Sequence, residues 1–232
     1  MEKITTLTFF RLNKNRFWAF KQMALSHKFL MNCPGLDFYK IMGTGSGKGF
    51  SLWPDFSTYA LLAVWDKNSS SEVFFRENVW LKKYMQKSNS CRTFYLKPFH
   101  SKGNWGGINP FISSIDREFN SNFSKIVVIT RASIRWYKLL SFWKSVPYAS
   151  KAIKDAIGVE FYKGIGEWPF IQQATFSIWK SEESIFDFAY ASGKHSEIIK
   201  KTKKNKWYKE DMFTRFKIIS DTDFKSTILE YK

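Results

Sequence analysis

Cysteine and histidine are scarce in this chain of 232 residues, which has two cysteines and three histidines. The cysteines, Cys33 and Cys91, have no further ligands beside them at the spacing of a zinc site. An isolated pair also argues against a disulfide framework and favours reduced thiols. The cysteine content therefore indicates a cytoplasmic protein.

Long apolar runs are also missing. No segment approaches the roughly 18 to 20 residues that a membrane-spanning helix needs. The first residues, MEKITTLTFFRL, carry Glu2 and lack the apolar core of a signal peptide. We expect a cytoplasmic location, and peripheral contact with the inner membrane is compatible with this composition.

Acidic residues are few, with 20 Asp and Glu against 37 Lys and Arg, so the net charge is +17. This excess favours an anionic partner, which a nucleic acid, an acidic membrane or an anionic cofactor would satisfy. Lysine-rich segments such as IIKKTKKNKWYK are equally typical of a solvated surface. The aromatic motif of RNA-binding sheets is absent from every predicted strand, so we expect no nucleic-acid partner.

A glycine-rich stretch, FYKIMGTGSGKGF, covers residues 38–50 and looks like a phosphate-binding loop. The P-loop requires a first glycine where this chain has Met42, and Ser or Thr where it has Gly49. The following residues have the pattern of a strand, whereas a P-loop opens a helix. The stretch is therefore predicted to connect two strands.

The tripeptide FYK occurs at residues 38–40 and again at 161–163. Each copy leads through a glycine-bearing loop to a strand that ends in tryptophan. Trp65 lies 65 − 40 = 25 positions after the first copy, and Trp179 lies 179 − 163 = 16 positions after the second. The chain therefore contains an internal repeat, whose first copy has the longer loop.

Each repeat has the order strand, helix, strand, strand, helix, strand, which is typical of a ferredoxin-like unit. One face of such a sheet is left bare by its helices, and two bare faces can pack together. We predict an α+β fold of tandem ferredoxin-like repeats that form a pseudo-symmetric dimeric α+β barrel. The predicted divisions are an N-terminal half (1–100), a linker (101–123) and a C-terminal half (124–232).

His195 is the candidate metal ligand. It shares an inward stripe with Ile198, Ile199 and Thr202, and Gly193 can break the preceding helix just before it. A helix N-terminus disfavours the imidazolium ion, and a neutral imidazole can bind metal. The pattern is more typical of a core histidine. A lone histidine ligand would fit haem best, because the porphyrin supplies the other four donors.

Five stretches of the sequence together span most of residues 9–219. They are FWAF, GLDFYKIMGTGSGKGF, TRASIRWYKLLSFWKSVP, GIGEWPFIQQATFSIW and FAYASGKHSEIIKKTKKNKWYKEDMFTRFKI. In these stretches, and in their order, the chain resembles the spheroidene monooxygenases of carotenoid biosynthesis. The family is similar in layout to the haem proteins of the dimeric α+β barrel type. In those proteins the axial histidine comes from the C-terminal half, so the resemblance implies that His195 binds the iron of haem b.

The resemblance also implies a haem site in the C-terminal half. The cofactor-binding residues that we expect, besides His195, are Lys163, Trp179 and Ile199. Polar residues on or beside the predicted inner strands are candidates for catalysis, although each can equally be a structural hydrogen-bonding group. These candidates are Arg131, Gln172, Gln173, Thr175 and Arg215.

The resemblance implies a haem-dependent monooxygenase that oxygenates a long apolar, carotenoid-like substrate. Because a shared scaffold does not fix a reaction, two alternatives stay open. One is a haem-dependent dehydratase or peroxidase acting on a small substrate, as in aldoxime dehydratases. The other is a non-enzymatic basic module that binds RNA or an anionic membrane. The electron donor and the oligomeric state do not follow from the sequence.

Overall fold

The computed structural model describes residues 3–47, 51, 53–115, 125–191, 200–202 and 204–223. The chain divides into two compact units. Unit 1 comprises Met1–Thr44, Asp55–Lys97 and Ile218–Lys232, and unit 2 comprises Gly45–Pro54 and Pro98–Lys217. The division of the chain at residues 101–123 stays a prediction.

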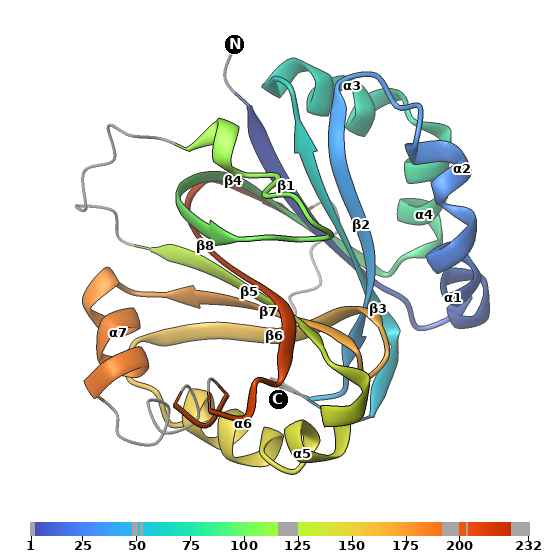
Figure 1. The fold of residues 1–232 in the computed structure, drawn as a ribbon. Helices are drawn as coiled ribbons and strands as arrows, with labels where there is room; N and C mark the ends of the chain where they lie inside the picture. The colour runs from blue at the N-terminus through green and yellow to red at the C-terminus, as the bar shows by residue number, and fades with distance from the viewer. Residues whose placement is uncertain are drawn as a thin grey trace. The chain divides into compact units, whose positions relative to one another are not determined.

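Unit 1 contains the first four strands and their helices, which cover one face of the sheet (Figure 1). Its elements in chain order are β1 (Ile4–Arg11), α1 (Arg16–Leu25), α2 (His27–Leu30), β2 (Leu36–Gly45), β3 (Pro54–Trp65), α3 (Asn68–Glu77), α4 (Val79–Lys87) and β4 (Ser90–Gly103). The strands β2, β3 and β4 each extend by some residues into unit 2.

Unit 2 repeats this order with shorter helices. Its elements are η1 (Ile112–Ser114), β5 (Ile126–Ile134), η2 (Trp136–Lys138), α5 (Leu139–Trp143), α6 (Val146–Lys154), β6 (Val159–Trp168), β7 (Gln172–Trp179), α7 (Glu182–Phe186), the π-helix η3 (Asp187–Ala191) and β8 (Tyr208–Asp223). The last residues of β8 belong to unit 1.

The strand order confirms the predicted fold class. Hydrogen-bonded neighbours follow the closed order β1-β3-β2-β6-β7-β5-β8-β4. Within unit 1 this order is β4-β1-β3-β2, and within unit 2 it is β8-β5-β7-β6. Both are the fourth, first, third and second strand of a ferredoxin-like unit. The chain therefore has the α+β barrel topology of a duplicated unit.

The two copies of the repeat predicted from FYK also share individual residue contacts. Trp65 pairs with Ile4 in unit 1, and Trp179 pairs with Ile126 in unit 2. Each tryptophan is buried and packs on a phenylalanine nine positions later (74 − 65 and 188 − 179), at centroid distances of 4.9 Å for Phe74 and 5.0 Å for Phe188. The tryptophans thus fix corresponding helices to the two sheets.

In both units a glycine lies beside the tryptophan. We call the glycine, the tryptophan and the phenylalanine on which it packs the glycine and tryptophan corner. Gly35 and Gly158 each lie three positions before FYK and have positive φ angles of 73° and 85°. The carbonyl of Gly35 accepts a hydrogen bond from Asp66 N at 2.9 Å, and that of Gly158 accepts one from Lys180 N at 2.8 Å. A Cβ atom on Gly158 would lie 2.6 Å from Ser184 Cβ. Both the angle and the space therefore require glycine.

The glycine-rich stretch joins strands β2 and β3, as predicted, and opens no helix. At its start the amide of Ser46 donates a hydrogen bond to the carbonyl of Trp53 at 2.8 Å. Residues 48–50 and 52 lie outside the described residues. This connection therefore has the geometry of a strand hairpin where it is described.

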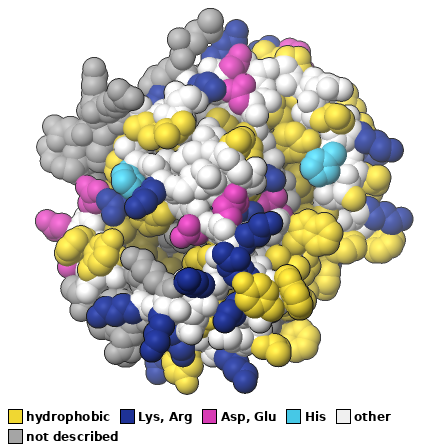
Figure 2. Space-filling model, in the orientation of Figure 1, with side chains coloured by type: hydrophobic (Ala, Val, Ile, Leu, Met, Phe, Trp, Pro, Cys, Tyr) yellow, Lys and Arg dark blue, Asp and Glu magenta, His cyan; other side chains and the backbone are white. Residues whose placement is uncertain are grey.

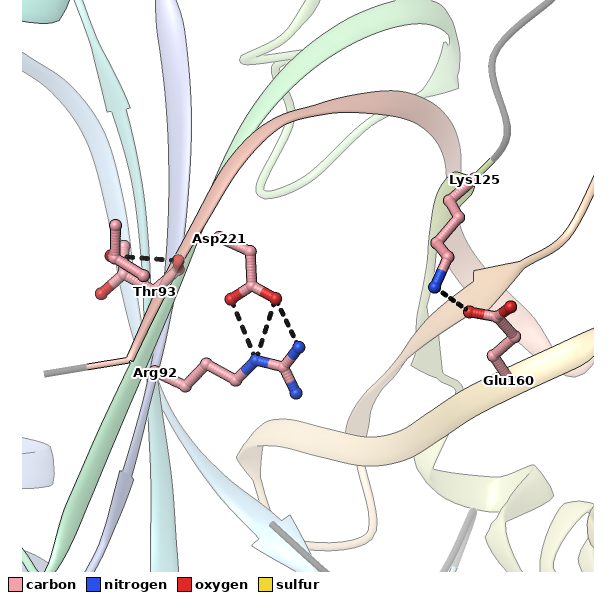
Figure 3. Close-up of polar contacts among 6 residues, drawn as sticks. Arg92, Thr93, Lys125, Glu160 and Asp221 are labelled. Atoms are coloured by element: carbon pink, nitrogen blue, oxygen red, sulfur yellow. Dashed lines mark hydrogen bonds and ion pairs between the residues drawn. The ribbon is translucent and has the colours of Figure 1, made fainter. Parts of the chain in front are cut away.

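Charged pairs fasten the ends of strands within each unit (Figure 3). In unit 1, Arg92 of β4 binds Asp221 of β8 through Nε at 2.9 and 3.1 Å and through a second nitrogen. This hydrogen bonding raises the pKa of the Arg92 guanidinium. In unit 2, Lys125 Nζ lies 2.8 Å from Glu160 Oε2. These pairs tie β8 to β4 and the start of β5 to β6.

The cysteines and the apolar segments can also be located in the structure. Cys33 and Cys91 form no disulfide with each other. In the part of the chain that the structure describes, no helix is both long and apolar enough to cross a membrane.

We predict that Gly158→Ala destabilises the protein more than Gly107→Ala does. Both glycines have a φ of 85°, so both substitutions incur the cost of a left-handed alanine, about 1 kcal/mol. Space is open around Gly107, whereas a methyl group at Gly158 meets Ser184, which adds about 1–3 kcal/mol. Urea unfolding of both variants measures the difference, and equal losses would contradict the proposed corner.

Candidate functional site

The sheet of unit 2 presents side chains on two faces, because successive residues of a strand alternate. One face packs on the helices: Ile126, Val128 and Trp179 form a core there with Ile153 of α6 and Ile185 of α7. The register places Arg131 on the opposite face, paired with Ala174 and Met212. The site residues predicted from sequence therefore divide between two surfaces.

The helix-facing surface holds four of the predicted residues. Trp179 lies at one end of β7, and Ser177 pairs with Val128, which in turn pairs with Arg215 of β8. Following the alternation, this face carries Gln173, Thr175, Trp179 and Arg215. The opposite face carries Arg131, Lys163 and Gln172.

Arg215 is the centre of a polar cluster on the helix-facing surface. Its Nη1 donates a hydrogen bond of 2.5 Å to Glu182 Oε1 of α7, and its guanidinium lies 5.3 Å from the ring centroid of Phe213. The same ring contacts His100 at a centroid distance of 6.2 Å. Desolvation, and then the positive charge of Arg215, lowers the pKa of His100, so its imidazole is neutral at pH 7.

This surface also has polar atoms whose hydrogen-bonding capacity is unused. Thr175 Oγ1 and Arg215 Nε are buried and have no partner among the described residues. Thr130 is exposed although it lies in the middle of the central strand β5, between buried Arg131 and Ile129. Figure 2 shows a hollow with a hydrophobic floor beside α7. Apolar walls with a few polar groups are typical of a binding site for a largely apolar molecule.

The opposite face carries an ion pair between the buried Arg131 and the partly exposed Glu210. Only 3% of the Arg131 side chain and 22% of the Glu210 side chain is exposed. Glu210 also accepts hydrogen bonds from the backbone amides of Gly106 at 2.8 Å and Gly107 at 2.7 Å. Burial alone would raise the pKa of Glu210, but these amides and the Arg131 guanidinium outweigh it and lower that pKa.

Trp105 covers the ion pair. The Arg131 guanidinium lies 5.7 Å from the ring centroid of Trp105, and the indole Nε1 donates a hydrogen bond of 2.5 Å to Glu167 Oε1. Nearby, Ser101 Oγ lies 2.8 Å from Thr214 Oγ1. We call residues 101–111, with Arg131, Glu210 and Glu167, the loop clasp. These contacts give Arg131 the surroundings of a structural group that fixes the loop.

The remaining predicted residues lie in different surroundings. Lys163 is almost fully buried, with 1% of its surface exposed, and donates a hydrogen bond of 3.0 Å to the carbonyl of Gly47. Gln173 donates one of 3.4 Å to the carbonyl of Trp168, and Gln172 is half-buried at the start of β7. The structure does not gather these side chains into one polar centre.

His195 and Ile199 lie outside the described residues, so the proposed ligand has no described geometry. The described chain resumes after them at Lys200, and the preceding π-helix η3 ends at Ala191. Within the described ranges, no three His, Cys, Asp or Glu side chains converge as a set of metal ligands.

Curated proteins similar to this chain share one name. Spheroidene monooxygenase of Rhodobacter capsulatus is 31% identical over 219 residues, which cover 93% of this chain and 90% of that protein. The chain belongs to the spheroidene monooxygenase family. Spheroidene monooxygenase of Cereibacter sphaeroides is 33% identical over 217 residues, covering 92% of this chain and 66% of that protein. The relative from Rubrivivax gelatinosus is 26% identical over 204 residues.

Solved structures agree on the fold of this spheroidene monooxygenase family member. An aldoxime dehydratase superposes with a TM-score of 0.59 at 9% identity, over 93% of this chain and 80% of that chain. An aldoxime dehydratase in complex with butyraldoxime gives a TM-score of 0.57 at 10% identity. At these identities the similarity establishes the fold alone. No family model matches the chain.

Sequence reasoning missed Glu210, Glu167 and Trp105. The two contacts that matter span 79 residues for Arg131 and Glu210, and 62 residues for Trp105 and Glu167. Trp105 lies in a segment predicted to be a linker, where an isolated aromatic residue has no periodicity. The GG pair after Trp105 is the one local signal, because two consecutive glycines can present backbone amides to an anion.

We predict that Glu210→Gln lowers the free energy of unfolding by about 2–3 kcal/mol at pH 7, because it leaves the charge of Arg131 buried without a counter-charge. Glu77→Gln is the matched control, since the Arg76–Glu77 pair is largely exposed, and it should cost less than about 0.5 kcal/mol.

The difference in free energy of unfolding between wild type and Glu210→Gln should depend on pH. The lowered pKa of Glu210 stabilises the folded state fully above the unfolded-state pKa, near 4.3. That stabilisation is lost as the pH falls through the folded-state pKa. Denaturant unfolding between pH 7 and pH 3 should show the free energies of unfolding of the two proteins becoming more similar as the pH falls. A difference that stays constant with pH would contradict the ion pair.

Proposed function

We propose that this protein is a haem-dependent monooxygenase that oxygenates a long apolar, carotenoid-like substrate. The observation that carries the proposal is family membership: two relatives named spheroidene monooxygenase are 31% and 33% identical over more than nine tenths of this chain. A monooxygenase reaction needs O2 and an external two-electron donor. We also propose a cytoplasmic location for the protein.

We place the haem on the helix-facing surface of unit 2, with His195 as the iron ligand and Ile199 beside it. The polar groups there fit such a cofactor. Arg215 has a guanidinium suited to a propionate, and both its Nε and Thr175 Oγ1 are buried without a described partner. Aromatic and aliphatic side chains complete the surroundings that a porphyrin requires. They are Val159, Tyr162, Trp179, Phe188 and Phe213.

The roles of the chain's residues follow from these positions. When bound, haem supplies the redox chemistry of O2 that the reaction requires. Arg215, fixed by Glu182, would orient the cofactor through its carboxylates. The apolar wall around Trp179 would exclude water and hold a polyene by shape. Thr175, whose buried Oγ1 has no described partner, would be available on this surface to donate a hydrogen bond.

The remaining candidate residues divide between the two faces of the sheet. Lys163, expected beside the haem, and Arg131 and Gln172, expected in catalysis, lie on the opposite face of the sheet. A catalytic role for these residues would need a substrate on that face. Gln173 shares the helix-facing surface with Thr175 and Arg215, so it stays a catalytic candidate in the proposed site.

The first test is an absorption spectrum. We expect purified protein, as isolated or after hemin addition, to show a Soret band, and His195→Ala to abolish or strongly shift it. His27→Ala is the control, because that imidazole contacts Tyr39 Oη at 2.9 Å in unit 1 and should leave the band unchanged. A protein that takes up no hemin would rule out the proposal.

A second test concerns the propionate partner. Arg215→Met should weaken hemin binding about tenfold, the effect of losing one charge-assisted hydrogen bond of about 1.4 kcal/mol. Arg92→Met removes an arginine that is equally paired with a carboxylate, in unit 1, and should leave hemin affinity unchanged. Equal hemin affinities of the two variants would contradict a contact between Arg215 and a haem propionate.

The reaction class requires a further comparison, because the fold alone does not fix it. One structure with this fold is an aldoxime dehydratase in complex with butyraldoxime. Adding butyraldoxime, peroxide or a carotenoid to the haem-loaded protein should shift its spectrum selectively with the carotenoid. A selective shift with butyraldoxime or peroxide would favour the dehydratase or peroxidase alternative.

A further inference from the structure

The first helices of unit 1 expose large apolar side chains along one stripe. Phe17, Phe20 and Met31 are 70%, 50% and 67% exposed. The helical backbone continues through Ser26, whose φ and ψ are −61° and −25°, so α1 and α2 follow one path. On such a path, positions 17, 20, 24 and 31 share a face. Phe20 also contacts Phe56 of β3, which is 51% exposed, at 5.9 Å between centroids.

The covered face of the same helices contains polar as well as apolar side chains. Gln22 and Ser26 are buried at 6% and 0% exposure, beside Ala19 and Leu30. Gln22 Oε1 accepts a hydrogen bond of 3.0 Å from Trp80 Nε1, which satisfies part of the buried amide. Phe17, Phe20 and Met31 are left outside this core and face solvent. A contiguous apolar patch of this kind marks an interaction surface.

Positive charge accompanies the patch. Residues 3–36 contain no Asp or Glu and six Lys and Arg residues. Lys21 and Lys28 lie on the apolar stripe, and Lys21 Nζ lies 4.6 Å from the ring centroid of Phe17. An open cleft of about 670 Å³ beside the start of α1 adds further cations. It is lined by Asn15, Val79, Lys82, Lys83, Gln86 and Lys87.

Figure 2 shows the resulting surface in space. Hydrophobic side chains and Lys or Arg side chains alternate along the edge where α1 and α2 lie in Figure 1. We define the α1–α2 face by Phe17, Phe20, Lys21, Lys28 and Met31.

We propose that the α1–α2 face docks on an anionic lipid bilayer. Aromatic rings favour the interface between headgroups and acyl chains, and Met31 can enter the acyl region, while lysines bind the anionic headgroups. Single-stranded RNA would use the rings for stacking, but gains little from an exposed methionine or from Leu25, which is 42% exposed. The inference does not depend on haem. It would give the enzyme access to a substrate dissolved in the membrane.

The experiment is flotation of the full-length protein with vesicles of phosphatidylcholine alone or with 30% phosphatidylglycerol. We expect binding to the anionic vesicles only, weakened by salt. Phe17→Ser combined with Phe20→Ser should lower the partition coefficient about tenfold, because two exposed rings no longer enter the interface. Lys21→Gln combined with Lys28→Gln should lower it about 25-fold at low salt, at roughly fivefold per lysine.

Matched controls are taken from unit 2. Ile112→Ser with Ile157→Ser removes side chains that are 63% and 91% exposed, and Lys180→Gln with Lys209→Gln removes two exposed charges. Both controls should retain at least half of wild-type binding.

Three results would overturn the proposal. The first is equal binding to neutral and anionic vesicles. The second is full retention of vesicle binding by the phenylalanine variant, with unchanged melting behaviour. The third is binding to an RNA oligonucleotide that is tighter than vesicle binding and is lost in the lysine variant while unaffected in the phenylalanine variant. That last pattern would assign the surface to nucleic acid.

Discussion

The alternation of side chains along a strand is the constraint that governs both units. Helices cover one face of each sheet, so every second residue of a strand meets a helix and its neighbours do not. In unit 2 this rule separates Thr175 and Arg215 from Arg131 and Lys163. Residues that are adjacent in sequence, such as Gln172 and Gln173, consequently lie on opposite faces of the sheet.

The same rule explains how much of the fold the sequence predicts. Alternating strands, amphipathic helices and the two FYK copies are local signals, and they are sufficient for the order of elements and the duplication. Trp65 and Trp179 could be equated from the sequence because each follows FYK at the end of a strand. The structure confirms the equation, since each pairs with the isoleucine that begins the first strand of its unit.

The candidate site could be predicted only in part. The sequence indicates Arg215 and Thr175 as polar residues on predicted strands, but no local signal reveals that both retain buried atoms without a described partner. The loop clasp was missed because its contacts join residues far apart in the chain. Glu210 is one of several acidic residues at the start of a strand, and its importance comes from Arg131 and two glycine amides that folding brings to it.

The glycine and tryptophan corner has a consequence for how this chain can diversify. In both units the glycine lies three positions before FYK and the phenylalanine nine positions after the tryptophan, with the same backbone hydrogen bond and ring contact, although the loop between FYK and the tryptophan differs in length. In each unit these contacts hold the sheet to its own helix. Side chains on the remaining surfaces of either unit can therefore change independently, without loosening the contact between sheet and helix that both units share.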